Sequence, residues 1–352
     1  MGLLNKAMKL LVLTPIAVFF GVMVIAHLVF EVLRRGPRAV FGKKSRPQPP
    51  PCLQDPDLGT HGYVYLEEVR LHYVSTGSEG KPLMLLVHGF PEFWYSWRYQ
   101  LKEFRDSYRV VAIDQRGYGD SDQPSSVSSY DITKLVTDIK NLVSALGYKK
   151  CVLVGHDWGG VVTWNVAQRH PEIVDKLIVM NCPTALAYAK LTQSKGGFSQ
   201  LKKSWYMFFF QLPWLPEVYI GMRDFLLLEQ VLLGDQSGVK SGTMSQEDVE
   251  AYKYTFGRCG FTAPINYYRQ MFRSTDMRTP AKTAHIKVSC PTLIVWGDQD
   301  QALEVRLAQL SSELNVEGGA TVKIIEGASH FVQMDRPDLV NKYMRRFLSS
   351  QM

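Results

Sequence analysis

Hydrophobic residues in this chain form one long run, several short runs and a set of helical repeats. From Leu10 to Phe30 there is no Asp, Glu, Lys or Arg, and most positions are aliphatic or aromatic. About 20 consecutive apolar residues match the thickness of a bilayer core. A cleaved signal peptide would have a shorter apolar stretch and a small-residue cleavage site, whereas this run ends in Phe-Glu-Val-Leu-Arg-Arg. The pattern predicts a retained membrane anchor over residues 1–33.

Short apolar runs alternate with helical repeats in the rest of the chain. The runs are continuous, which is typical of strands buried on both faces of a parallel sheet. They are Leu83–Val87, Arg109–Ile113, Cys151–Val154, Thr292–Trp296 and Thr321–Ile325. Between the second and third runs, Asp131 can cap a helix of regular apolar spacing that Gly147 ends. The alternation predicts an α/β fold, with a mostly parallel sheet flanked by helices.

Residues 184–284 interrupt this alternation. The stretch is rich in aromatic residues, as in Trp205–Phe210, and its pattern predicts helices without strands. Ser245 and Asp248 resemble a capping box at the start of one of them. A helical insertion between two strands of a parallel sheet would cover the carboxyl ends of the strands, where such sheets bind ligands. We expect an anchor at 1–33, a linker at 34–58 and a body at 59–352 with a helical lid at about 184–284.

The net charge of +7 belongs to the N-terminal segment. The first 50 residues contain eight Lys and Arg residues and one acid, Glu31, which leaves 32 residues of each sign in the remainder. A balanced body lacks the electrostatic footprint of a nucleic-acid-binding protein. Two lysines precede the apolar run and six basic residues follow it, so the positive-inside rule places the body in the cytosol. We expect a single-pass protein of the endoplasmic reticulum.

The linker and the cysteines add less specific signals. Residues 34–51 are basic and then proline-rich, which is typical of a solvated, semi-extended spacer, while attraction to anionic lipid headgroups is the alternative. The five cysteines are odd in number, scattered and without zinc-binding spacing. They therefore indicate reduced thiols rather than a disulfide framework.

The sharpest local motif follows the third apolar run. Gly155-His156-Asp157-Trp158-Gly159-Gly160 matches the strand-to-helix turn Gly-x-nucleophile-x-Gly, in which small residues let one side chain project upward. The nucleophile position holds Asp157, and a carboxylate suits attack on a saturated carbon that bears a leaving group. An isolated aspartate here could simply cap a helix. The glycines and the partners described next favour a nucleophile.

Those partners follow in the order nucleophile, acid, histidine. Asp300 lies just after the run Thr292–Trp296, and His330 lies in the loop after the last run. His330 is the candidate base, and Asp300 is the candidate carboxylate that orients its ring. Asp298 belongs to the same turn and is the alternative acid.

At this point the chain resembles the epoxide hydrolases of the α/β-hydrolase family, from about Gly59 to the C-terminus. The resemblance rests on the aspartate elbow together with two further motifs, His88-Gly89-Phe90-Pro91 and the stretch 114–122, Asp-Gln-Arg-Gly-Tyr-Gly-Asp-Ser-Asp. The anchor resembles that of the membrane-bound members. The resemblance implies that the backbone amides of Phe90 and Trp158 form an oxyanion hole and that the bond before Pro91 is cis.

The resemblance also implies two lid tyrosines that hydrogen-bond the epoxide oxygen. Tyr268 and Tyr206 match their positions, whereas the neighbouring Tyr267 should point elsewhere and packing within the lid is the alternative role. The implied reaction converts a lipophilic epoxide, such as an epoxy fatty acid, to a vicinal diol through an ester on Asp157, and His330 activates the water. It requires no metal or organic cofactor, and the partners are substrate, water and membrane lipid. The oligomeric state is left open.

Two other functions fit part of the pattern. Haloalkane and fluoroacetate dehalogenases share the aspartate elbow, but the former typically carry Asn where this chain has Phe90, and the latter typically carry Arg where it has Trp158. A catalytically silent, membrane-tethered binding protein would typically lack one member of the triad, and all three are present. Both alternatives stay open at this stage.

Overall fold

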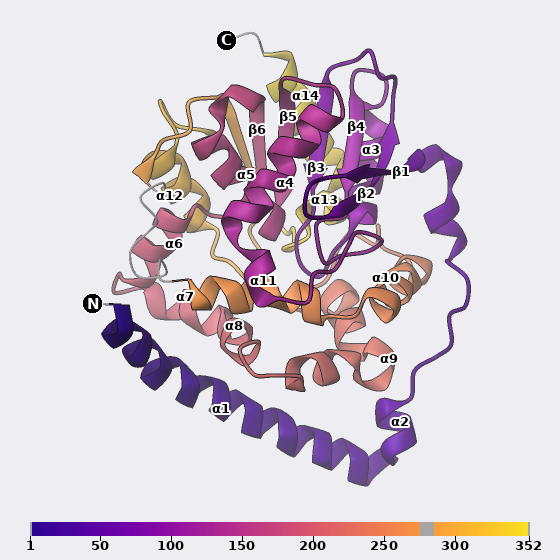
Figure 1. Cartoon of the computed structure of the whole chain (residues 1–352), viewed down its shortest axis with the longest axis vertical. Helices are drawn as coiled ribbons and strands as arrows, with labels where there is room; N and C mark the ends of the chain where they lie inside the picture. The colour runs from indigo at the N-terminus through magenta and orange to yellow at the C-terminus, as the bar shows by residue number, and fades with distance from the viewer. Residues whose placement is uncertain (1, 275–284, 351–352) are drawn as a thin grey trace.

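A computed structural model describes residues 2–274 and 285–350 and shows a central sheet with helices on both faces (Figure 1). At one end of the sheet lies a layer of helices, and the N-terminal helix runs along the outside of that layer. The sheet has eight strands in the order β1-β2-β4-β3-β5-β6-β7-β8. The strands are β1 Thr60–Tyr65, β2 Arg70–Thr76, β3 Leu83–Val87, β4 Arg109–Ile113, β5 Cys151–His156, β6 Val174–Met180, β7 Thr292–Gly297 and β8 Thr321–Ile325.

The prediction of a mostly parallel sheet is confirmed, with one antiparallel edge. From β4 through β8 each neighbouring pair is parallel, whereas β1 with β2 and β2 with β4 are antiparallel. The continuous apolar runs of β3, β4 and β5 are buried throughout, as expected for central strands. The mixed burial of β1 and β2 explains why no continuous run marks them in the sequence.

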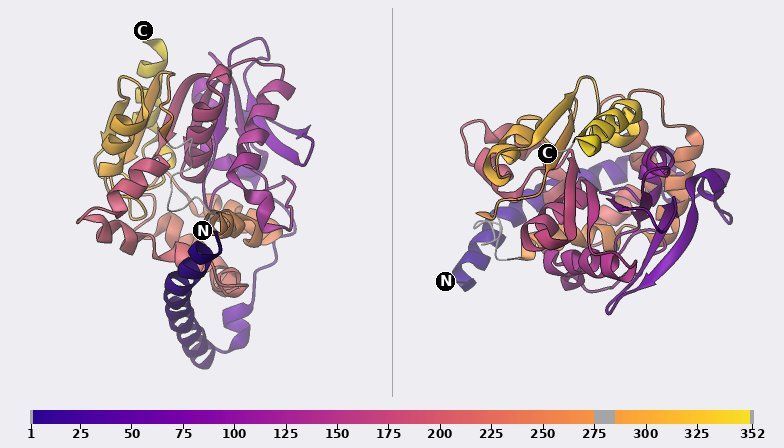
Figure 2. Two further views of the ribbon diagram at one scale, coloured as in Figure 1. Left: turned by 60° about the vertical axis from the view of Figure 1, so that its left-hand side comes forward. Right: turned by 90° about the horizontal axis from the view of Figure 1, so that it is seen from above.

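Helices cover both faces of the sheet (Figure 2). The pair α3 and α14 are in contact, as are α4 and α5, and α5 packs directly on β5. The helices are α1 Gly2–Arg35, α2 Pro37–Phe41, α3 Arg98–Phe104, α4 Ile132–Ala145, α5 Trp158–Arg169, α6 Ala185–Thr192, α7 Gly197–Lys203, α8 Trp205–Phe209, α9 Leu215–Leu233, α10 Gln246–Cys259, α11 Thr262–Arg273, α12 Arg306–Asn315, α13 Val332–Asp335 and α14 Pro337–Ser349.

The capping residues that the sequence predicted for two helices are found at the ends of those helices in the structure. The Asp131 carboxylate accepts the Thr133 amide at the start of α4, and Gly147 has a φ of 86° just after the helix. At the start of α10, Ser245 and Asp248 form the predicted capping box. These caps satisfy amides that a helix leaves unpaired in its first turn.

The insertion between β6 and β7 forms the helical layer over the carboxyl ends of the strands. It contains α6 to α11, and its described parts, residues 181–274 and 285–291, contain no strand beyond an isolated bridge at Val288. The last ten residues of the expected lid, 275–284, lie outside the described residues. The helices α8 to α11 lie below the sheet in Figure 1, between the sheet and α1.

The N-terminal helix packs on this lid. Its segment Thr14–Arg35 is long and apolar enough to cross a membrane. One side of α1 contacts α8 and α9, and the Phe20 ring lies 5.2 Å from the Trp205 ring. The linker that follows is largely exposed from residue 42 to residue 50, as a solvated spacer would be, but the Arg46 side chain is only 11% exposed because it pairs with the lid.

Helix α9 is interrupted by a left-handed turn. Arg223, Asp224 and Phe225 have φ values of 50°, 54° and 63°, so three consecutive residues with side chains adopt the left-handed conformation. This conformation costs about 1–2 kcal/mol per residue, and it normally occurs at single positions. Contacts made by these side chains must therefore hold the turn.

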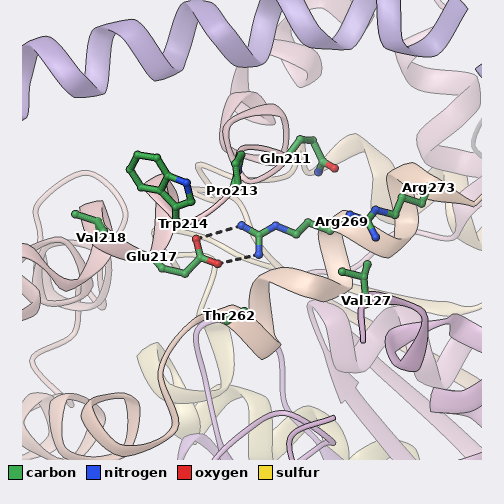
Figure 3. A pocket seen from close by; sticks show the side chains of 9 residues that line it. All are labelled: Val127, Gln211, Pro213, Trp214, Glu217, Val218, Thr262, Arg269 and Arg273. Carbon is green, nitrogen blue, oxygen red and sulfur yellow. Dashed lines mark hydrogen bonds and ion pairs between the residues drawn. The ribbon is translucent and has the colours of Figure 1, made fainter. Parts of the chain in front are cut away.

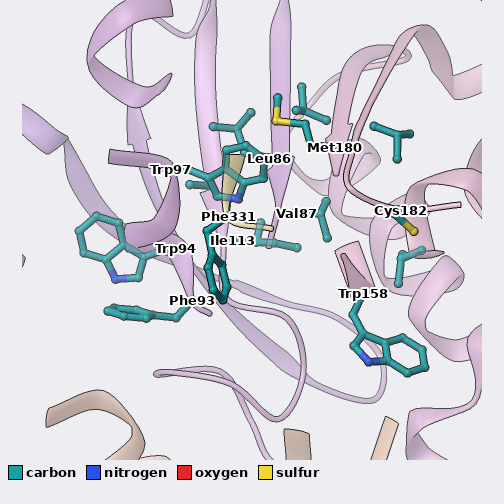
Figure 4. Packing of buried hydrophobic residues seen from close by; sticks show 14 of the residues in the cluster. Leu86, Val87, Phe93, Trp94, Trp97, Ile113, Trp158, Met180, Cys182 and Phe331 are labelled. Atoms are coloured by element: carbon teal, nitrogen blue, oxygen red, sulfur yellow. The ribbon is translucent and has the colours of Figure 1, made fainter. Parts of the chain in front are cut away.

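The core joins the sheet to the loops at its carboxyl end. Leu86 and Val87 of β3, Ile113 of β4 and Met180 of β6 are buried, and Trp97 packs in the same region (Figure 4). On the other side, α5 comes so close to β3 that a Cβ atom on Gly159 would overlap the carbonyl groups of Val87 and His88. Gly159 is thus required for the helix to meet the sheet at this distance.

Replacing Gly159 with alanine should therefore destabilise the fold by about 3 kcal/mol, because backbone atoms must move to admit the methyl group. Chemical denaturation measures the change. Gly80→Ala is the matched control, since no atom lies within 4 Å of the added Cβ, and it should change stability by less than about 0.5 kcal/mol. Equal stabilities for the two variants would show that α5 does not depend on this close contact.

Candidate active site

The nucleophile candidate occupies the turn between β5 and α5. Asp157 has φ 49° and ψ −118°, an unusual conformation for a residue with a side chain and one that concentrates at functional sites. Its Oδ1 accepts the Phe90 amide at 2.8 Å. Gly89 allows this approach, because a Cβ atom there would collide with the Asp157 side chain. The elbow predicted from the sequence therefore projects a carboxylate toward the loop after β3.

His330 lies between two carboxylates. Its Nδ1 is 2.8 Å from Oδ2 of Asp300, and its Nε2 is 3.6 Å from Oδ2 of Asp157, which is longer than a direct hydrogen bond. Asp300 is buried, and its Oδ1 accepts the amides of Ala302 and Leu303. These bonds fix the carboxylate and leave Oδ2 for the histidine. The structure thus brings together the three residues that the sequence indicated, with His330 between Asp157 and Asp300.

Asp298 does not take part in this arrangement. Its Oδ1 accepts the Gly327 amide at 2.8 Å and so ties the turn after β7 to the turn after β8. Of the two aspartates considered from the sequence, Asp300 is therefore the one that contacts His330.

The charges of the three residues support one another. Burial alone would lower the pKa of His330, but the carboxylates of Asp300 and Asp157 outweigh it and raise that pKa well above its usual value. Burial alone would raise the pKa of Asp157 and of Asp300, yet the adjacent His330 lowers both. In the free protein the site therefore favours an imidazolium between two carboxylates.

The loop after β3 supplies the candidate oxyanion hole. The peptide bond between Phe90 and Pro91 is cis, as the resemblance implied. Trp158 is the first residue of α5, so its amide has no acceptor within the helix. His88 is buried; its Nδ1 donates to the Gly89 carbonyl and its Nε2 accepts the Gln115 amide. Burial lowers the pKa of His88, which fits a neutral ring that braces the loop.

The two candidate tyrosines come from different lid helices and meet above the site. The rings of Tyr206 in α8 and Tyr268 in α11 are 5.9 Å apart, and Tyr268 also packs edge-on against Phe90 and Trp158. Burial, aided by the nearby Asp157 charge, raises both tyrosine pKa values well above normal. Both hydroxyls therefore keep their protons and can donate. Tyr267 points elsewhere, because its hydroxyl donates to the Arg116 carbonyl at 2.8 Å.

A buried pair that sequence reasoning did not single out connects the loops of the site. The Glu92 carboxylate accepts the Gly89 amide and lies 2.7 Å from Nδ1 of His156, while Nε2 of His156 lies 2.8 Å from the His330 carbonyl. Burial would raise the pKa of Glu92, but His156 lowers it, so the carboxylate is ionised. Both nitrogens of the His156 ring therefore face acceptors. The sequence could have indicated this pair through the positions of its members. His156 directly precedes Asp157, and Glu92 directly follows the His-Gly-Phe-Pro motif.

Asn181 was also missed. It follows β6 directly, with a φ of 42°, and its Nδ2 donates to Oδ2 of Asp300 at 2.7 Å while its Oδ1 accepts the Gly297 amide. Asparagine tolerates this conformation better than most residues. Its place at the carboxyl end of a central strand was the signal that could have identified it.

A pocket of about 630 Å³ opens on the lid next to this site (Figure 3). Arg269 crosses it to pair with Glu217 at 2.8 Å, and Gln211 donates to the Tyr268 carbonyl at 3.4 Å. The lining includes neither the triad nor the two candidate tyrosines, so this pocket is separate from the candidate reacting centre. Its residues are Val127, Gln211, Pro213, Trp214, Glu217, Val218, Thr262, Arg269 and Arg273.

Within residues 2–274 and 285–350, no three His, Cys, Asp or Glu side chains are grouped so that they could hold a metal ion. The chemistry that the described side chains can perform is nucleophilic attack, proton transfer and stabilisation of a negative oxygen. All five cysteines are free.

Comparison with known proteins agrees with this geometry. Residues 82–217 match the family model for the alpha/beta hydrolase fold. Epoxide hydrolase 4 of Homo sapiens is 44% identical over 324 residues, 91% of this chain and 87% of that protein. Epoxide hydrolase 1 of Caenorhabditis elegans is 46% identical over 315 residues, 89% of this chain and 75% of that protein. A crystal structure of Bacillus megaterium epoxide hydrolase with an inhibitor has a TM-score of 0.75 at 34% identity, over 82% of this chain and 100% of that one.

The fold and the elbow, acid and histidine loops at the carboxyl ends of β5, β7 and β8 define a hydrolase of the α/β-hydrolase fold. Within that class, the identity and coverage of its relatives show that this chain belongs to the epoxide hydrolase family.

Because two carboxylates raise the pKa of His330, removing either charge should lower it. Asp300→Asn should lower the pKa more than Asp157→Asn, since Asp300 lies closer. NMR titration of labelled imidazole nitrogens measures both changes, and His330→Gln assigns the signal. Asp298→Asn is the matched control and should leave the pKa unchanged. A pKa that responds to Asp298 but not to Asp300 would reverse the choice between them.

Proposed function

We propose that this protein hydrolyses lipophilic epoxides, including epoxy fatty acids, to vicinal diols through a covalent ester on Asp157. The observation that carries the proposal is the placement of His330 between Asp300 and Asp157, under two protonated tyrosines from the lid. An aspartate nucleophile suits a saturated carbon, and a pair of donors suits an oxygen that becomes negative as a ring opens.

The first half-reaction is alkylation of the enzyme. A carboxylate oxygen of Asp157 forms a bond to an epoxide carbon, and the carbon–oxygen bond of the ring breaks. Tyr206 and Tyr268 donate hydrogen bonds to the departing oxygen, which takes the proton of one tyrosine and becomes a hydroxyl. The proton that His330 loses as its pKa falls restores that tyrosine. These hydrogen bonds strengthen as the oxygen gains charge, so they favour the transition state over the bound substrate.

The second half-reaction is hydrolysis of the ester. Once Asp157 is esterified, one of the two charges that raise the pKa of His330 is gone, so that pKa falls and the neutral ring becomes accessible. Neutral His330, oriented by Asp300, takes a proton from water as the water oxygen attacks the ester carbonyl. The amides of Phe90 and Trp158 hold the resulting oxyanion. The bond between the intermediate and the substrate oxygen then breaks, and that oxygen takes the proton of the added hydroxyl group. The diol leaves, Asp157 is again a carboxylate, and His330 keeps the proton taken from water.

The proposed substrates are lipophilic because of the lid and the anchor. Phe90, Phe210 and Trp158 surround Tyr268 with aromatic surface, which favours an apolar chain over a hydrated one. We also propose that α1 anchors the protein in the membrane of the endoplasmic reticulum, with the hydrolase body on the cytosolic side. The apolar segment Thr14–Arg35 and the six basic residues after residue 33 support this placement.

His330→Gln should separate the two half-reactions. The variant keeps the nucleophile and the tyrosines, so it should open the epoxide but fail to hydrolyse the ester. Intact-protein mass spectrometry should show one adduct with the mass of the epoxide, and peptide mapping should place it on Asp157. Asp157→Asn should form no adduct. An adduct on any other residue would contradict the mechanism, and no adduct in His330→Gln would mean that the histidine activates the nucleophile itself.

In the same assay, Tyr206→Phe and Tyr268→Phe should slow formation of the adduct. Losing one donor to a developing oxyanion typically costs about 10²–10³ in rate. Tyr267→Phe is the matched control, because that hydroxyl is bonded to the Arg116 carbonyl. If all three variants alkylate at the same rate, the tyrosine pair only packs the lid.

The orientation of the body can be tested independently. A tag at the C-terminus should be digested by protease added to intact microsomes, because the basic flank follows the apolar run. Permeabilised microsomes control for access of the protease to the tag. Protection of the tag in intact microsomes alone would place the body in the lumen.

A further inference from the structure

The left-handed turn inside α9 is held by residues from the N-terminal segment. Its three strained residues each contact a different residue that precedes the hydrolase body. Arg223 pairs with Glu31 at 3.4 Å, Asp224 pairs with Arg46 at 2.6 Å, and the Phe225 ring lies 4.6 Å beneath the ammonium group of Lys43. A simple tether between an anchor and an enzyme needs none of these contacts.

Among these residues, Arg46 forms hydrogen bonds with two different lid helices. Its guanidinium donates two hydrogen bonds to the Asp224 carboxylate, at 2.7 and 2.6 Å, and Nε donates to Glu250 in α10 at 2.8 Å. The Lys44 amide also donates to Asp224. The planar fork of arginine therefore joins the turn in α9 to α10, in a geometry that a lysine cannot reproduce.

From this turn a series of aromatic contacts leads to the nucleophile. Phe225 is buried, and its ring lies 6.2 Å from that of Phe261 at the start of α11. The Phe261 ring lies 6.3 Å from the Phe90 ring, and the Phe90 amide donates to Asp157. Because packed interiors transmit small shifts between neighbours, the backbone at 223–225 influences where Phe90 lies.

We propose that Arg46, with Lys43 and Glu31, is a positioning residue for the reaction: it holds the left-handed turn of the lid, and the turn sets Phe90 through Phe225 and Phe261. The linker is then part of the enzyme rather than a passive spacer. The inference rests on the proposed function for its rate measurement, but its structural half stands on the contacts of the turn alone.

The test compares two alanine variants of the full-length protein in detergent or nanodiscs, with styrene oxide as the probe. Arg46→Ala should increase amide hydrogen exchange at residues 222–226 and lower the saturating rate of alkylation about tenfold, the middle of the range for coupled neighbours, without changing the dissociation constant of the probe. Lys44→Ala removes the same charge but keeps its backbone contact with Asp224, so both readouts should match wild type. Arg46→Lys should fall between the two.

Asp224→Asn provides a second route if Arg46→Ala does not fold. Asparagine accepts the left-handed conformation, so this variant removes only the ionic contact and should show the same rise in exchange and the same fall in rate. The proposal is overturned if Arg46→Ala and Asp224→Asn match Lys44→Ala in exchange and in rate, or if the loss of rate comes entirely from weaker probe binding. A wild-type protein that does not open the epoxide would contradict the proposed function, while the exchange comparison would still test whether Arg46 holds the turn at residues 223–225.

Discussion

The buried contact between Glu92 and His156 is the interaction on which the site depends. Three separate loops must meet within hydrogen-bond distance, and each comes from a different strand. Glu92 holds the loop after β3 through the Gly89 amide, and His156 belongs to the elbow and reaches the backbone of His330. A carboxylate is expensive to bury, and removing the partner of Glu92 would leave that carboxylate unpaired at a cost of about 3–5 kcal/mol. The pair therefore couples the position of Asp157 to that of His330.

The lid contributes side chains to the candidate site that the sheet and its loops do not provide. The loops of the sheet provide Asp157, His330 and Asp300, but the two tyrosine hydroxyls come from α8 and α11, which belong to the insertion between β6 and β7. Arg269 fixes these two parts of the lid to each other, because it bonds the carbonyls of Phe210 and Leu212 as well as Glu217. The candidate site thus lies between the sheet and a lid whose own shape requires several ionic contacts.

Much of the catalytic layer could be predicted from the sequence, because its signals are local. The apolar runs of β3, β4 and β8 match the observed strands, and the elbow and the His-Gly-Phe-Pro motif specify turns through glycine and proline. The rest depends on contacts between distant residues. Asp300 could not be separated from Asp298 because both lie in one turn, and only folding shows which of them faces His330. The left-handed turn at 223–225 lacks glycine, so no local signal marks it.

The topology places β6 beside β7 although residues 181–291 lie between them. Closing such a loop carries an entropic cost that rises only with the logarithm of its length, so doubling the insertion would add about 0.6 kcal/mol. The stability of the sheet is therefore nearly independent of how large the lid is. Lids of different length and composition can be carried by the same set of strands, and the range of accepted substrates can diverge while the reacting groups stay fixed.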